Sequence, residues 1–219
     1  MSLITETVPF DQAAPPTRRY RSNDELEMRA AVERWGRERW PEARQVHELV
    51  MNRGSVRADM AIIGTDHFVS VEIKSEYDST ERLMNQSGMF RLASPELWLV
   101  MHQRHLRDAD LIRYLIPSIG VVQAVREKPY GGSFQIEVVH EAQRYDPLPV
   151  ALLSLLWVAE LHDEAVRRRL WSGKAPTHAK LTALLERSLN RSEQIEAVCR
   201  QLRAREALWR ADPRIEIAA

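Results

Sequence analysis

The sequence predicts an α/β domain in which helices flank a mixed central β-sheet, followed by a helical C-terminal extension. Up to about residue 146, short apolar stretches alternate in the two-residue pattern of strands and are interrupted by helical periods. Beyond Pro147 the apolar residues recur only at helical intervals. We therefore expect three parts: an arm at residues 1–21, a core at 22–146 and a helical extension at 147–219.

The N-terminal arm contains the segment AAPPTRRYR, in which two prolines precede basic residues without any apolar period. Such a segment is typical of a flexible arm. A helix is predicted over residues 22–40, because Ser22 and Glu25 have capping-box spacing and apolar residues then recur at helical intervals. This helix should end before Pro41.

Strand patterns follow the first helix. Residues 43–51, 55–64 and 68–75 predict three strands, and a Gly-Thr-Asp turn between the last two makes them a meander. A second helix is predicted at residues 79–93, because Asp78 and Glu81 repeat the capping-box spacing. The apolar segment LWLVM then predicts a further strand.

The remaining sheet and the extension have clear patterns. Residues 119–125 and 134–140 predict two strands joined as a hairpin through the turn YGGS. Residues 149–170 and 177–210 are amphipathic and predict helices separated by the loop SGKAP. The last stretch has the outline of two helices joined by a short turn. A hairpin that only packs is favoured there over a DNA-reading helix-turn-helix.

Composition limits the class of protein. With 44% hydrophobic and 28% charged residues among 219, the chain suits a globular protein with a buried core. The sequence contains no apolar run of membrane-spanning length and no recognisable secretory signal, so we expect a cytoplasmic protein without a membrane partner. Lys+Arg and Asp+Glu both number 31, so a nucleic-acid partner must be held by local patches. Cys199 and the tryptophans, Trp35 and Trp157 among them, are expected in the core.

Three charged residues stand inside the predicted strands: Asp59, Glu72 and Lys74. Side chains alternate along a strand, so Glu72 and Lys74 should face one way while Val71 and Ile73 pack under a helix. Asp59 lies on the neighbouring antiparallel strand and should lie beside Glu72. Two such carboxylates repel unless a cation lies between them, and oxygen ligands suit Mg²⁺ or Mn²⁺. Lys74 could then orient the water that attacks a phosphodiester.

This arrangement resembles the PD-(D/E)XK nuclease superfamily, whose signature is an acid on one strand followed by Glu-x-Lys on the next. Asp59 matches the first acid, and Glu72-Ile73-Lys74 matches the Glu-x-Lys, while Ala58 stands where a proline often precedes the acid. The resemblance implies a restriction-endonuclease-like core and metal-dependent hydrolysis of nucleic acid, with DNA favoured over RNA. Asp59 and Glu72 would then be the metal ligands.

The superfamily implies two further site residues. Many members carry a glutamate on the helix before the sheet, which Glu27 matches as a third metal ligand, with Glu25 and Glu33 as alternatives. Recombination-type members add a glutamine on the helix after the Lys strand, which Gln86 matches as a residue that positions metal-bound water or phosphate. Phe90 stands where a tyrosine often follows that glutamine.

The segments RADMAII, VEIKSEYDSTERLMNQ and LLWVAEL look like a bacterial PD-(D/E)XK-like family of largely unassigned role, over roughly residues 24–210. A bacterial or phage endonuclease that acts on DNA and could form a homodimer is the resulting expectation. The alternative is a catalytically silent nuclease fold that binds nucleic acid or serves as an assembly module. An accessory structural protein of a mobile element is a third hypothesis.

Several charged residues have a second interpretation. Asp59, Glu72 and Lys74 could form an ion-pair cluster without a metal. Glu48 is either an extra acidic ligand or an edge charge, and Arg57 either binds phosphate or forms a salt bridge. The arginines at 167–169 and after residue 200 are interleaved with glutamates, which favours a solvated helix face over a phosphate track.

Overall fold

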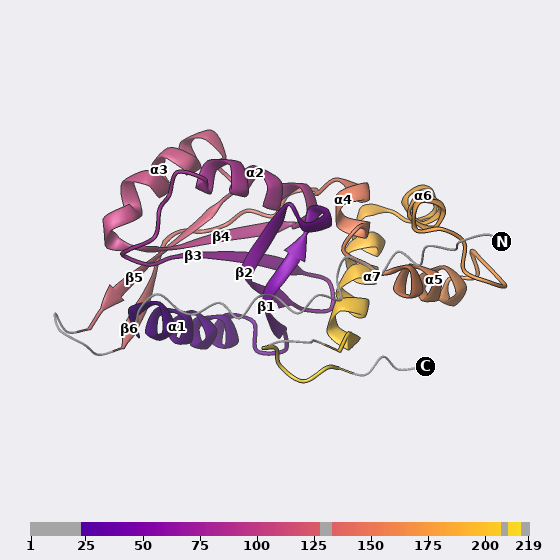
Figure 1. Ribbon diagram of the computed structural model, residues 1–219, viewed down its shortest axis with the longest axis horizontal. Coiled ribbons are helices and arrows are strands. Elements are labelled where there is room, and N and C mark those ends of the chain that lie inside the picture. The colour runs from indigo at the N-terminus through magenta and orange to yellow at the C-terminus, as the bar shows by residue number, and fades with distance from the viewer. Residues whose placement is uncertain (1–22, 128–132, 207–209, 216–219) are drawn as a thin grey trace, which may run out of the picture.

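The computed structural model describes residues 23–127, 133–206 and 210–215 (Figure 1). Its strands are β1 (Arg44–Met51), β2 (Val56–Ile63), β3 (Phe68–Lys74), β4 (Glu96–His102), β5 (Gly120–Arg126) and β6 (Phe134–His140). Its α-helices are α1 (Asn23–Arg39), α2 (Leu83–Ala93), α3 (Leu106–Leu115), α4 (Pro149–Leu153), α5 (Val158–Arg167), α6 (His178–Ser188) and α7 (Arg191–Ala204). The described residues also include two 3₁₀ turns, η2 (Asn52–Gly54) and η3 (Gln103–His105).

The six described strands form one mixed sheet in the order β1-β2-β3-β4-β5-β6. The meander β1-β2-β3 is antiparallel, β3, β4 and β5 run parallel, and β6 returns antiparallel to β5. Parallel neighbours need crossover connections, which α2 and α3 provide. Figure 1 shows α1 on one face, α2 and α3 on the other, and α4 to α7 gathered at one end. The expected fold class is confirmed.

Apolar residues fill both faces of the sheet. The cluster under α1 contains Val71 and Ile73, which confirms that these two residues pack under a helix. It also contains Trp35 and Trp98, whose ring centroids lie 5.2 Å apart in an edge-to-face arrangement. The predicted core position of Trp157 is only partly confirmed, because its ring is half-buried under the Arg205 guanidinium.

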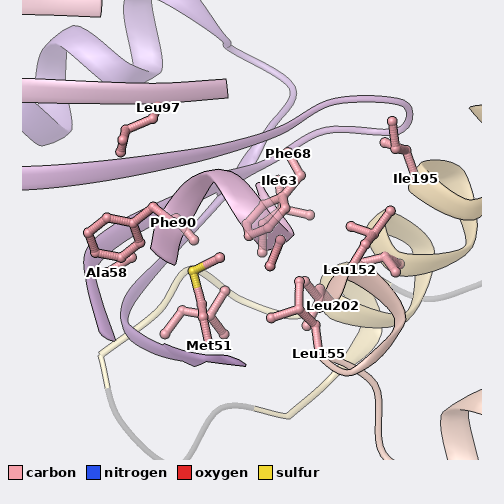
Figure 2. Packing of buried hydrophobic residues seen from close by; sticks show 14 of the residues in the cluster. Met51, Ala58, Ile63, Phe68, Phe90, Leu97, Leu152, Leu155, Ile195 and Leu202 are labelled. Atoms are coloured by element: carbon pink, nitrogen blue, oxygen red, sulfur yellow. The ribbon is translucent and has the colours of Figure 1, made fainter. Parts of the chain in front are cut away.

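The opposite face joins the sheet to the C-terminal helices. Figure 2 shows Met51 and Phe90 together with Leu152 and Leu202, so strand, crossover helix and extension share one core. Cys199 belongs to this cluster and is fully buried, as its apolar spacing predicted. The extension therefore packs as part of the core.

Three helix predictions were wrong in detail. The helix α3 was missed, because most of its apolar residues face outward and only Ala109 and Ile112 are buried. The helix α2 begins at Leu83 instead of residue 79, since the Asp78 carboxylate accepts hydrogen bonds from the Ser75 N–H and hydroxyl instead of capping a helix.

The predicted helix over residues 149–170 is divided into α4 and α5. Glu160 accepts a hydrogen bond from the Trp157 N–H at 2.7 Å and so caps a new helix start. The helix α6 packs against α4 and α5, whereas α7 packs against α4 and β2. The N-terminal arm and Ser22 lie outside the described residues, as does most of the YGGS turn. No helix in the described ranges has the length and apolar character to span a bilayer.

Residues 210–215 form a segment that we call the C-terminal strap, and its residues 210–212 cover the free edge of β1. The His47 N–H donates to Arg210 O, and the Asp212 N–H donates to Gln45 O. The Asp212 carboxylate accepts from the Gln45 N–H at 2.9 Å, and Arg37 donates two further hydrogen bonds to it. The strap thus satisfies main-chain groups that an edge strand would otherwise expose.

A buried carboxylate joins α5 to α7. Glu164 is fully buried and accepts two hydrogen bonds from Arg200, at 2.8 and 2.7 Å, and one from Gln201. We expect Glu164→Ala to lower the free energy of unfolding by about 3–5 kcal/mol, because it leaves Arg200 without its paired charge. Urea unfolding followed by circular dichroism measures this, and the exposed Glu206→Ala is the control. Equal losses in both variants would contradict the stated role of Glu164.

Candidate active site

The site begins where β2 and β3 stop pairing. The pairing ends at Met60 and Val71, and beyond this point the two strands separate. We call this point the fork, and Asp59, the neighbour of Met60, lies at it. Ala58 and Met60, two residues apart, belong to the clusters on opposite faces, so β2 changes sides at Asp59. On the neighbouring strand Glu48 has φ +55°, a conformation that non-glycine residues rarely adopt. The distortion in β1 and the change of face in β2 therefore lie side by side.

At the fork, the carboxylate of Asp59 takes the place of a main-chain hydrogen-bond partner between β2 and β3. Its Oδ2 accepts a hydrogen bond from the Ile73 N–H at 2.9 Å. The Arg29 guanidinium, from α1, donates to the Asp59 carbonyl at 2.9 Å and to its Oδ1 at 3.3 Å. Asp59 is 5% exposed, so these bonds lie in a largely dry environment where they are strong.

Glu72 and Lys74 lie next to this carboxylate on β3, with Glu72 3% exposed. The Lys74 ammonium donates to Glu72 Oε1 at 2.8 Å. Burial lowers the pKa of Lys74, but the charges of Glu72, Asp59 and Asp78 outweigh burial and raise it above its usual value. Lys74 is therefore positively charged at neutral pH, and it interacts electrostatically with both predicted metal ligands, Asp59 and Glu72.

Arg29, a residue that sequence reasoning missed, lies at the centre of a second group of charges. Its Nη2 is 3.3 Å from Asp59 Oδ1, 3.5 Å from Glu48 Oε1 and 4.0 Å from Glu25 Oε1. We call Glu25, Arg29, Glu48 and Asp59 the acid–arginine cluster. Glu25 and Arg29 are four residues apart on α1, and this i,i+4 spacing on a buried helix face was the available signal.

The structure does not bring Glu27, the predicted third metal ligand, together with Asp59 and Glu72. Its Oε2 accepts from Arg126 at 3.0 Å, and Asp24 binds the same guanidinium at 2.7 Å. Position 27 is two residues from position 25, so the two side chains leave the helix in different directions. Glu25, the alternative, is the α1 glutamate that points toward Asp59 through Arg29.

Glu48 and Arg57 form a salt bridge, with Arg57 Nε 2.8 Å from Glu48 Oε2. The salt-bridge interpretation of Arg57 is thus the one that the structure shows. Glu48 is an inward-facing member of the acid–arginine cluster, because its side chain is only 16% exposed and contacts Arg29.

Gln86 lies on α2, on the same side of the sheet as Glu72 and Lys74. Leu83 and Phe90 are fully buried on either side of it and anchor the helix as expected. The Gln86 side chain is half-buried. Its role in positioning water or phosphate stays a prediction.

The carboxylate oxygens of Asp59 and Glu72 suit a hard cation that takes few ligands from the protein and keeps several water ligands. Among the described residues there is no group of three or more His, Cys, Asp or Glu side chains arranged to hold a metal ion. Asp59 and Glu72 offer carboxylate oxygens from adjacent strands, and Mg²⁺ is commonly bound by one or two carboxylates with water and substrate oxygens. The two residues fit such an ion.

The comparisons with known proteins give one result. A family model described as Bacteriophage P4 protein cII matches residues 19–218. The chain belongs to the bacteriophage P4 cII family. No curated protein matches the chain, and no solved structure matches it either. The match extends over the core and the C-terminal helices, so both belong to what defines this family.

His47 makes the cluster sensitive to pH. Burial, together with the charges of Arg210 and Arg29, lowers its pKa from 6.5 to about 4. Below pH 6.5 the unfolded chain takes up a proton that the folded chain refuses, so stability falls as the pH drops from 6.5 toward 4. We expect His47→Gln to remove roughly 2 kcal/mol of this loss, measured as the difference in the free energy of unfolding between pH 7 and pH 4.5 by urea unfolding. His162→Gln, on α5, should keep the wild-type loss, and an unchanged loss in His47→Gln would contradict the assignment.

Proposed function

We propose that the chain is a metal-dependent nuclease that hydrolyses phosphodiester bonds, with DNA as the favoured substrate. The observation that carries the proposal is the position of the Asp59 carboxylate at the β2–β3 fork, beside the ion pair of Glu72 and Lys74. Two acids and a lysine from adjacent strands are the arrangement that the PD-(D/E)XK resemblance implies. The family description names a bacteriophage protein and no activity. The support for the proposal therefore comes from the site alone.

Asp59 and Glu72 would hold one Mg²⁺ or Mn²⁺. When bound, such an ion polarises a phosphate oxygen and lowers the pKa of a coordinated water. The hydrogen bond from the Ile73 N–H fixes the Asp59 carboxylate, so one ligand is oriented before the ion arrives. Glu72 is held by Lys74 in the same way.

Lys74 acts as a cation and not as a base. Its raised pKa keeps the ammonium charged, so it cannot accept a proton from water at neutral pH. It stands two residues from Glu72 on the same face of β3, where its charge can stabilise negative charge growing on the phosphate. A group fixed in advance and largely shielded from solvent is effective in this role.

One observation favours a second candidate, a nuclease fold that binds nucleic acid or a partner without turnover. Arg29 already neutralises the Asp59 carboxylate at 3.3 Å. A buried guanidinium close to a metal ligand competes with the ion for the same charge. The two candidates differ in whether Asp59 retains enough negative charge to hold a divalent ion.

Substitutions at three positions test the proposal, with labelled single-stranded, duplex and branched DNA as substrates in Mg²⁺ or Mn²⁺. Asp59→Asn should lower metal affinity and cleavage together, because it removes a charge that the ion needs. Lys74→Ala should leave metal binding in place while cleavage falls by about 10²-fold or more. Glu27→Gln is the matched control, since Glu27 pairs with Arg126 outside the site, and its cleavage should equal that of wild type.

The result that would sink the nuclease proposal is equally specific. It is a wild-type protein that cleaves no substrate with either ion, yet binds DNA as tightly as Asp59→Asn and Lys74→Ala do. That outcome would leave the binding module as the function. Melting curves of each variant separate loss of chemistry from loss of fold.

A further inference from the structure

The acid–arginine cluster places one guanidinium nitrogen between three carboxylates. Three carboxylates from three elements, α1, β1 and β2, converge on Arg29 Nη2 at 3.3–4.0 Å. Arg29 is 2% exposed and Glu25 is 4% exposed, so these two charges are almost completely shielded from bulk water. Carboxylates brought together in this way need a cation between them.

The other nitrogen of the same guanidinium is bound as well. Arg29 Nη1 donates to the Asp59 carbonyl at 2.9 Å and lies 3.5 Å from His47 Nδ1. A guanidinium presents its donors in a rigid plane and stays charged at every accessible pH. Contacts on both terminal nitrogens therefore fix the position of Arg29 in the cluster.

We propose that Arg29 is an internal cation that replaces a divalent ion among Glu25, Glu48 and Asp59. The chain then binds no ion inside the acid–arginine cluster. It retains room for a single divalent ion, on the Glu72 side of Asp59. The first of these statements stands on the geometry of the cluster, and the location of the remaining ion rests on the proposed nuclease function.

The inference explains why Asp59 has two different neighbours. Its Oδ1 accepts a hydrogen bond from Arg29. Its Oδ2 faces β3 and accepts a hydrogen bond from the N–H of Ile73, the residue directly after Glu72. The two ions of a two-metal site lie about 3.5–4 Å apart, so they would have to lie on both sides of Asp59. Here Arg29 occupies the Oδ1 side, which leaves only the side toward Glu72 for an ion.

The test counts Mn²⁺ ions bound per chain, by electron paramagnetic resonance of free Mn²⁺ at equilibrium. Arg29→Gln removes the internal cation and should bind one more Mn²⁺ than wild type. Arg29→Lys keeps the charge and should bind the wild-type number. Arg44→Gln is the matched control, because Arg44 is equally buried but donates to the main-chain carbonyls of Leu202, Arg203 and Arg205.

Thermal melting gives a second readout. Without divalent ions, Arg29→Gln and Arg44→Gln should both melt about 10 °C below wild type, because each loses a buried guanidinium. Mn²⁺ should recover most of that loss in Arg29→Gln and little in Arg44→Gln. If Arg29→Gln folds only when Mn²⁺ is present, the ion has taken the place of the guanidinium, which supports the inference.

The outcomes separate this inference from the proposed function. Wild type with no bound Mn²⁺ and Arg29→Gln with one would support the internal cation and refute the metal-dependent nuclease. Two Mn²⁺ ions in wild type, or an equal number in wild type and Arg29→Gln, would overturn the inference whatever the cleavage assays give. If Arg29→Gln does not fold under any condition, a Mn²⁺ gained by Arg29→Lys would overturn it, because charge would then not be what excludes the ion.

Discussion

The hydrogen bond between the Ile73 N–H and the Asp59 carboxylate is the contact on which the candidate site depends. At this point β2 leaves β3, and a main-chain donor of an interior strand would otherwise lose its ladder partner. The Asp59 Oδ2 accepts the hydrogen bond in place of a main-chain carbonyl, so β2 and β3 can diverge without leaving the Ile73 N–H unpaired. The same carboxylate thereby comes to rest next to Glu72 and Lys74, and the local repair of the sheet is also what assembles the charges.

The helix α1 supplies the second support. It packs over the sheet through apolar residues such as Met28 and Val32, yet the same face carries the buried pair Glu25 and Arg29. Burying charge is costly unless each charge meets an opposite one in good geometry. The pairing therefore fixes the rotation and the position of α1 more strictly than apolar packing alone, because a shift of one residue would separate Arg29 from Asp59.

Much of this arrangement could be predicted from the sequence, and the misses have physical reasons. Alternation along β3 gave the faces of Glu72 and Lys74 correctly, because strand periodicity is fixed by the backbone. Which α1 glutamate turns toward Asp59 could not be predicted, because Glu27 is drawn to Arg126, a residue about a hundred positions along the chain, while Glu25 faces Arg29. The change of face in β2 and the strap over β1 depend on contacts between distant segments, so no local pattern indicates them.

The C-terminal strap has a consequence for how the chain is made. Residues 210–212 cover the edge of β1, but the ribosome synthesises them only after the entire sheet and the helices α4 to α7. Until then the main-chain groups of Gln45 and His47 have no strap to pair with, and a growing chain carries an open strand edge of the kind that pairs with other nascent chains. Synthesis from the N- to the C-terminus therefore leaves the edge of β1 open to other strands until residues 210–212 have been made and have paired with it.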